Sequence, residues 1–98
     1  MSIENIMNAI QEKAVGVAPL GSTIKFDFGE KQLFLDGTGE ANKVSMENKE
    51  AACTVKISED NFKKLIGGDL NPMSALMTGK LKIKGDMGVA MKLQSLFA

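Results

Sequence analysis

Hydrophobic and polar positions alternate along this chain with two different periods, and the two periods predict its helices and strands. Apolar residues recur every three or four positions over residues 3–14, which is the spacing of an amphipathic helix. From residue 23 to residue 57 the period is two, as in strands that bury one face. Glycine-containing or polar turns divide that region, so we expect strands at residues 23–28, 32–36, 43–46 and 53–57. A second short helix should follow, capped by Ser58 and ended by Gly67-Gly68.

The last third of the chain is predicted as a short helix, a strand and a closing helix. Asn71 is suited to cap the short helix, and Pro72 suits its first position because the missing N–H would be unpaired there. Gly79 ends that helix, and residues 80–84 then alternate lysine with an apolar residue, as in a strand with one solvated face. Asp86 is placed to cap the closing helix.

The closing helix, residues 87–97, is apolar around most of its circumference. A terminal helix of a small domain usually has a single apolar stripe, so this helix should touch something on more than one side. Its own core, a partner chain, a membrane surface and a bound apolar ligand all fit the pattern. The grouping of strands before most of the helices predicts an α+β fold with a largely antiparallel sheet.

Several segments of the last third closely resemble the C-terminal signature of the sterol carrier protein lipid-binding domain family. They are Asn71-Pro72, residues 79–88 (GKLKIKGDMG) and residues 90–94 (AMKLQ). The resemblance continues upstream through residues 51–70, although Ala52 stands where family members often carry aspartate. It implies a five-stranded, mostly antiparallel sheet covered on one face by helices, in the order α-β-β-β-β-α-α-β-α. It also implies an apolar tunnel for lipid between the sheet and the helices.

Length and composition narrow the classes of function. A chain of 98 residues predicts one domain, residues 1–98, and the balance of 12 basic and 12 acidic residues favours neither nucleic acid nor an acidic membrane as partner. Tyrosine and tryptophan are absent, which argues against stacking on single-stranded bases. The N-terminus does not follow the signal-peptide pattern, and no apolar run approaches a membrane span. We therefore expect a cytoplasmic protein.

Few residues in this chain offer catalytic chemistry. Histidine is absent and cysteine occurs once, so histidine-based metal sites, histidine triads and internal disulfides are excluded. Cys53 shares its strand parity with Val55 and Ile57, which predicts a buried structural thiol. Asp27 and Asp36 lie on neighbouring predicted strands and could approach one another, but both occupy solvated positions. We expect no enzymatic activity, no cofactor and no metal.

The side chains expected to line the tunnel are mostly apolar residues of the helices after the fourth strand. Methionine is frequent among them, and flexible thioethers repack around apolar guests of different shapes, although core filling is the alternative role. The predicted lipid-binding residues are Phe62, Ile66, Met73, Leu76, Met77, Met87, Met91, Leu93, Gln94, Leu96 and Phe97. Leu96 and Phe97 are expected near a mouth or plug, and Gln94 near a polar group of the ligand.

A basic stripe accompanies these apolar residues. Lys80, Lys82 and Lys84 fall on one strand face and are predicted to contact anionic headgroups or a membrane surface. Solvated lysines that protect an edge strand are the alternative.

Together with the resemblance, these observations predict a non-enzymatic domain that binds an apolar lipid and transfers or presents it inside the cell. The lipid would be a fatty acyl, acyl-CoA, prenyl or sterol compound, and nothing in the sequence selects among these. We expect a monomer or weak dimer with transient contacts to a membrane or a lipid enzyme. The alternative is an interaction module whose closing helix docks on a biosynthetic enzyme or on a second copy of the chain.

Overall fold

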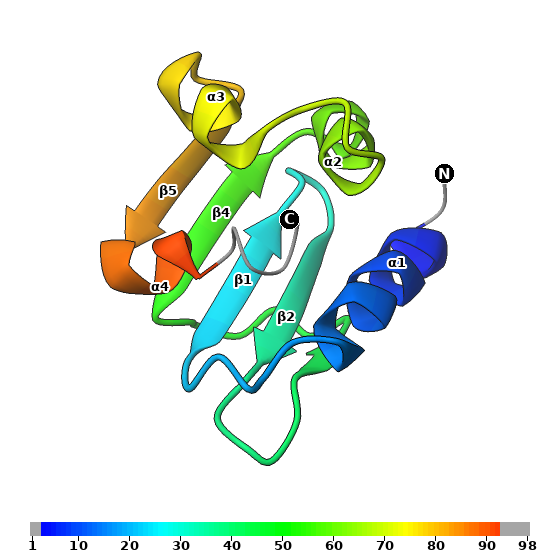
Figure 1. The fold of residues 1–98 in the computed structure, drawn as a ribbon, viewed down its shortest axis with the longest axis vertical. Helices are drawn as coiled ribbons and strands as arrows, with labels where there is room; N and C mark the ends of the chain where they lie inside the picture. The colour runs from blue at the N-terminus through cyan, green and yellow to red at the C-terminus, as the bar shows by residue number, and fades with distance from the viewer. Residues whose placement is uncertain (1–2, 93–98) are drawn as a thin grey trace.

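The computed structural model describes residues 3–92 of the chain, and its elements follow the predicted order (Figure 1). They are α1 (Ile3–Val15), β1 (Thr23–Asp27), β2 (Gln32–Asp36), β3 (Lys43–Ser45), β4 (Cys53–Ile57), α2 (Glu59–Ile66), α3 (Pro72–Met77), β5 (Leu81–Gly85) and α4 (Met87–Met91). The predicted α+β class and the order of helices and strands are confirmed.

Within residues 3–92 the five strands form one sheet, in the order β3-β2-β1-β4-β5. The β1–β2, β2–β3 and β4–β5 pairs are antiparallel, whereas β1 and β4 run parallel at the centre. The sheet is therefore mostly antiparallel, as predicted, but mixed. Residues 46–52 carry the chain from the β3 edge back to the centre, which leaves β5 as the other edge strand.

The two faces of the sheet differ in polarity because side chains alternate along each strand. One face carries Ile24, Phe26, Leu33, Leu35 and Val55, all 1% exposed or less. These side chains pack with Ile6 and Ile10 of α1 and with Phe62 and Leu65 of α2 to form the core. The helices lie on this face, with α1 and α4 over opposite margins of the sheet (Figure 1). The other face carries most of the strand lysines.

The three helix caps expected from the sequence in the second half of the chain are confirmed. Ser58 Oγ accepts a hydrogen bond from the Asn61 N–H at 3.1 Å, and Asn71 Oδ1 accepts from Met73 N–H at 2.8 Å. Asp86 Oδ1 accepts from Gly88 N–H at 2.8 Å at the start of α4. Each bond satisfies a backbone N–H that the helix cannot pair internally.

The closing helix is shorter in its described part than the sequence predicts. α4 ends at Met91, and Lys92 lies in a turn. The Lys92 N–H bonds to the Val89 carbonyl, three residues back, at 3.0 Å, which tightens the last turn. The predicted continuation through residue 97 lies outside the described residues.

A buried asparagine fixes the segment between α1 and β1. The Asn42 side chain is the buried polar residue of the core, at 3% exposure. Its Oδ1 accepts from the Leu20 N–H at 3.0 Å, and its Nδ2 lies 3.2–3.3 Å from the carbonyls of Ala14, Val17 and Ala18. One side chain thus binds four backbone groups at the end of α1 and in the segment that follows it.

Candidate functional site

Exposed methionines gather on the two helices that flank β5. Met73 and Met77 of α3 are 47% and 83% exposed, and Met87 and Met91 of α4 are 52% and 71% exposed. In the described chain only Val15 and Met46 join them as large exposed apolar side chains. α3 precedes β5 and α4 follows it, and both pack against it (Figure 1). We call these four methionines the methionine surface; α3 carries two of them at the start of β5, and α4 carries the other two at its end.

The core beneath this surface is incompletely covered. Ile83 of β5 lies opposite Val55 and faces the helices, yet it is only partly buried whereas Val55 is 1% exposed. Leu76 of α3 and Ile66 of α2 are also partly buried and pack against the same core. The apolar core thus ends in partly exposed side chains on β5, α2 and α3.

The predicted lipid-binding residues therefore differ in how deeply their side chains are buried. Phe62 is fully buried, with its ring centroid 5.5 Å from that of Phe26 and 5.2 Å from that of Phe28. Ile66 and Leu76 lie at the margin of the core, and the four methionines lie outside it. Leu93, Gln94, Leu96 and Phe97 lie outside the described residues. The tunnel implied by the resemblance stays a prediction.

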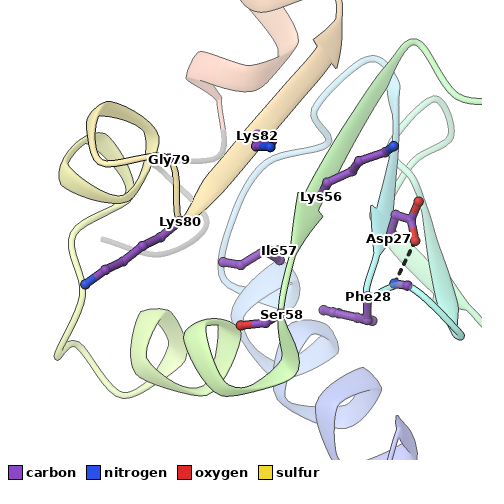
Figure 2. A pocket seen from close by; sticks show the side chains of 9 residues that line it. Asp27, Phe28, Lys56, Ile57, Ser58, Gly79, Lys80 and Lys82 are labelled. Atoms are coloured by element: carbon purple, nitrogen blue, oxygen red, sulfur yellow. Dashed lines mark hydrogen bonds between the residues drawn. The ribbon is translucent and has the colours of Figure 1, made fainter.

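A lysine-rich hollow of about 570 Å³ lies at one end of the sheet, where β1 and β4 end and β5 begins. Its lining residues, the lysine pocket, are Asp27, Phe28, Gly29, Lys56, Ile57, Ser58, Gly79, Lys80 and Lys82 (Figure 2). Of the lysines predicted to contact headgroups, Lys80 and Lys82 lie in this pocket. Lys84 is exposed further along β5, opposite Thr54, and does not line it.

Lys56 is the pocket lysine that sequence reasoning missed. Strand alternation places it on the polar face of β4, but only the register shows that it lies directly opposite Lys82 of β5. In the sequence, the alternation of apolar and polar residues over residues 53–57 assigns Lys56 to the polar face of its strand. It does not predict which residue of a neighbouring strand lies opposite Lys56.

Asp27 and Asp36 do not meet, and the expectation that they could approach one another is wrong. In the β1–β2 register Asp27 lies opposite Gln32 and Asp36 opposite Thr23, at opposite ends of the hairpin. A hydrogen bond from the Gly29 N–H, 2.9 Å from Asp27 Oδ1, is the main cause that lowers the pKa of Asp27. Hydrogen bonds from Thr38 lower the pKa of Asp36 in the same way. Both carboxylates serve the turns that follow their strands.

Cys53 is fully buried, as the strand parity predicts. Burial raises the pKa of its thiol, and the charge of Asp86 raises it further, so the thiolate needed for nucleophilic attack is disfavoured. Within residues 3–92 no three cysteine or acidic side chains gather closely enough to hold a metal ion. The helices of that segment are also too short or too polar to cross a membrane.

Comparison with known proteins identifies the family of this chain. The model of the SCP-2 sterol transfer family matches residues 3–98. The chain belongs to the SCP-2 sterol transfer family. Its resemblance to sterol carrier proteins, stated above from the last third of the sequence, is thereby confirmed.

Among relatives of this family, human sterol carrier protein 2 is 45% identical over 58 residues, which are 59% of this chain and 11% of that protein. The chain thus matches a small part of a much longer relative. The crystal structure of sterol carrier protein 2 like 2 from Aedes aegypti superposes with a TM-score of 0.74 at 20% identity, covering 94% of this chain and 93% of that one. The solution structure of the palmitated protein from the same organism gives 0.73 at 22% identity, covering 99% and 95%. These structural likenesses show the shared fold.

Proposed function

We propose that this chain binds an apolar lipid between its sheet and the helices flanking β5, and transfers or presents it inside the cell without catalysing a reaction on it. The observation that carries this proposal is the methionine surface, on the two helices that flank β5 and its partly buried Ile83. Exposed apolar side chains that gather on one part of a small domain are candidates for a binding site. Methionine adapts its shape to the guest, so this surface suits lipids of several classes.

Membership of the SCP-2 sterol transfer family supports the proposal. One of the similar structures, that of the Aedes aegypti protein, is described as palmitated, so that protein carries a fatty acyl group. By extension we propose fatty acyl chains, prenyl chains or sterols as the ligand class here.

Hydrophobic burial alone accounts for useful affinity. Each methylene removed from water contributes roughly 0.8 kcal/mol, before the costs of ordering the chain and losing its translational freedom. An acyl chain of about a dozen carbons therefore reaches roughly micromolar binding without a specific polar contact.

The state of the reactive groups supports a carrier rather than an enzyme. Cys53 is buried with a raised pKa, and the carboxylates of Asp27 and Asp36 lie at opposite ends of a hairpin. In the described part of the chain these groups do not converge on a common site.

Native mass spectrometry of the freshly purified protein tests the proposal, followed by solvent extraction of whatever co-purifies. We expect an adduct of lipid mass, and a higher melting temperature on adding a matching fatty acid, prenol or sterol, because a ligand that binds only the folded state stabilises it. An unliganded protein that gains no thermal stability from any of these lipids would overturn the proposal.

The same exposed methionines also fit a second candidate, an interaction module that docks on a partner enzyme or a second copy of the chain. Concentration-dependent dimer formation without bound lipid, abolished by Met87→Glu and Met91→Glu, is the result that would favour it.

A further inference from the structure

The two edges of the sheet differ in how their backbone polar groups are satisfied. At the β3 edge the side chain of Gln11, in α1, bonds as a neighbouring strand would. Its Oε1 accepts a hydrogen bond from the Val44 N–H at 3.1 Å, and its Nε2 donates to the Asn42 carbonyl at 3.1 Å. Within residues 3–92 the hydrogen bonds of β5 go to β4 alone. In that segment β5 is therefore the open edge of the sheet.

The register of β4 with β5 shows which backbone groups of the open edge point outward. The Asp86 N–H donates to the Ala52 carbonyl at 2.9 Å, and these two residues continue the β4–β5 register by one position. In an antiparallel ladder, pairs of residues that exchange hydrogen bonds alternate with pairs that do not. Counting back from Asp86, the even-numbered residues of β5 bond to β4. The residues that turn their backbone groups outward are Leu81, Ile83 and Gly85.

The second half of this edge is accessible. Leu81 is 3% exposed, but Ile83 is only partly buried and Gly85 is exposed. The side chains of Lys82 and Lys84 are exposed as well. Figure 1 shows β5 as the outermost strand on its side of the sheet. A row of unpaired backbone groups is a template for another strand, so residues 82–85 can accept an extended segment.

The side chains of β5 define the chemistry that such a segment needs. Residues opposite one another in neighbouring strands lie on the same face of a sheet. A residue paired with Ile83 would thus cover the partly exposed Ile83 side chain on the helix-covered face. Residues paired with Lys82 and Lys84 would lie on the other face, beside two ammonium groups. Opposite charges on neighbouring strands are stabilising, so a segment that alternates apolar and acidic residues complements β5.

A second copy of this chain is a poorer partner for the same edge. Two β5 strands paired with one another would place lysine side chains beside lysine side chains, and like charges on neighbouring strands are destabilising. Lysines on an edge strand oppose self-pairing for this reason. The same lysines attract an acidic strand.

We propose that the β5 edge binds an extended segment of a partner protein by strand addition, and that this segment alternates apolar and acidic residues. The backbone groups of Ile83 and Gly85 form the new hydrogen bonds, and Lys82 and Lys84 select the charge of the segment. This inference goes beyond lipid binding, and it places the partner on β5 rather than on α4.

Fluorescence anisotropy of two labelled peptides, Val-Glu-Val-Glu-Val-Glu-Val and Val-Lys-Val-Lys-Val-Lys-Val, tests the inference on the full chain. We expect the glutamate peptide to bind roughly tenfold or more tightly at low salt, because two or more opposite-charge pairs form only with it. Equal binding of the two peptides, or no binding of either, would overturn the proposal.

N-methylated glutamate peptides separate strand addition from charge attraction alone. Methylation removes an amide hydrogen, and in an added strand every second amide faces β5. Methylating the valine amides should abolish binding of an antiparallel strand, whereas methylating the glutamate amides should leave it unchanged. A parallel strand would reverse these two results and still support strand addition. Tolerance of methylation in both sets would refute it.

Charge reversal on β5 tests the role of the two lysines. Lys82→Glu/Lys84→Glu should exchange the preference, so that the lysine peptide binds more tightly than the glutamate peptide. Lys31→Glu/Lys43→Glu makes the same change of charge on exposed lysines away from β5 and should keep the wild-type preference. Melting temperatures check that both variants fold. An equal loss of preference in both would assign the effect to net charge and contradict the proposal.

Amide hydrogen exchange, followed by NMR, locates the contact. Saturating glutamate peptide should slow exchange of the Ile83 N–H tenfold or more, while the Val44 N–H at the other edge stays unchanged. Protection of Ile83 that rises with protein concentration, without peptide, would assign the edge to a second copy and overturn the proposal. Lipid binding by a chain that binds neither peptide would leave the carrier function standing and refute this inference.

Discussion

The amine of Lys92 donates a hydrogen bond to the backbone carbonyl of Leu20, 2.7 Å away and 72 residues earlier in the chain. The N–H of the same Leu20 is held by Asn42 Oδ1 at 3.0 Å. Both backbone polar groups of one residue are thus fixed by distant side chains. This ties the end of α4 to the segment between α1 and β1.

Lys92→Met should lower the free energy of unfolding by about 1 kcal/mol, because the Leu20 carbonyl loses a charged donor while the aliphatic stem is largely retained. Urea unfolding measures the change. Lys92→Arg keeps a donor and should stay within a few tenths of wild type. A methionine variant as stable as wild type would mean that water replaces the amine at no cost.

Asn42→Ala should cost about 2–3 kcal/mol, because the Leu20 N–H and the carbonyls of Val17 and Ala18 lose their partner in the core. Asn48 provides the matched control, since its side chain accepts a bond from Lys25 at 3.2 Å on the exposed face. Asn48→Ala should change the unfolding free energy by less than about 0.5 kcal/mol. Similar losses in both variants would show that burial does not set the cost.

Gly85→Ala and Gly29→Ala separate backbone strain from steric overlap. Both glycines have positive φ, +109° and +98°, but a Cβ at Gly29 meets nothing whereas one at Gly85 would overlap the Ala52 carbonyl oxygen. We expect Gly29→Ala to cost roughly 1 kcal/mol and Gly85→Ala about 3 kcal/mol. Thermal unfolding compares them, and equal losses would mean that Ala52, before β4, shifts away from β5 to make room.

Met91→Trp tests the lipid-binding surface. Because Met91 is 71% exposed, the larger ring should change the melting temperature little, while it changes the shape of the methionine surface and weakens lipid binding. The expected loss of affinity is tenfold or more, measured by displacement of a fluorescent fatty acid. Met46→Trp is the control, since Met46 is 54% exposed but follows β3 at the far edge of the sheet. Equal losses of binding in the two variants would exclude the methionine surface as the lipid site.

The carboxylate of Asp27 should make the fold sensitive to acid. Its pKa in the folded chain lies below the ordinary value of 3.8, so its ionised form favours the folded state. That contribution is present above the unfolded pKa and is lost as pH falls through the folded pKa. Urea unfolding from about pH 5 to about pH 2.5 should therefore show a shallower loss of stability in Asp27→Asn than in wild type. Parallel pH profiles would contradict the lowered pKa.

The elements of this fold were accessible from the sequence because each has a local signal. Ser58, Asn71 and Asp86 predict where helices start. The alternation of apolar and polar residues predicts the buried face of each strand. The strand order has no such signal. The parallel β1–β4 pair depends on contacts between residues about 30 positions apart, and Lys56 meets Lys82 only through that order.

Hydrophobicity likewise predicts which residues avoid water, but not how deeply each is placed. Phe62 and Met77 are both apolar helix residues, yet one is fully buried and the other 83% exposed. Asn42 gives no sequence signal for its role at all. Its four backbone partners become visible only in three dimensions.

The parallel pairing of β1 with β4 has a consequence for how this chain is made. The first three strands can form a hairpin and its extension as soon as they are synthesised, but β1 keeps one unpaired edge until residues 53–57 have arrived. An exposed central strand edge is a template for pairing with other chains. A nascent chain halted before residue 53 therefore carries its greatest tendency to aggregate at the strand that becomes the middle of the finished sheet.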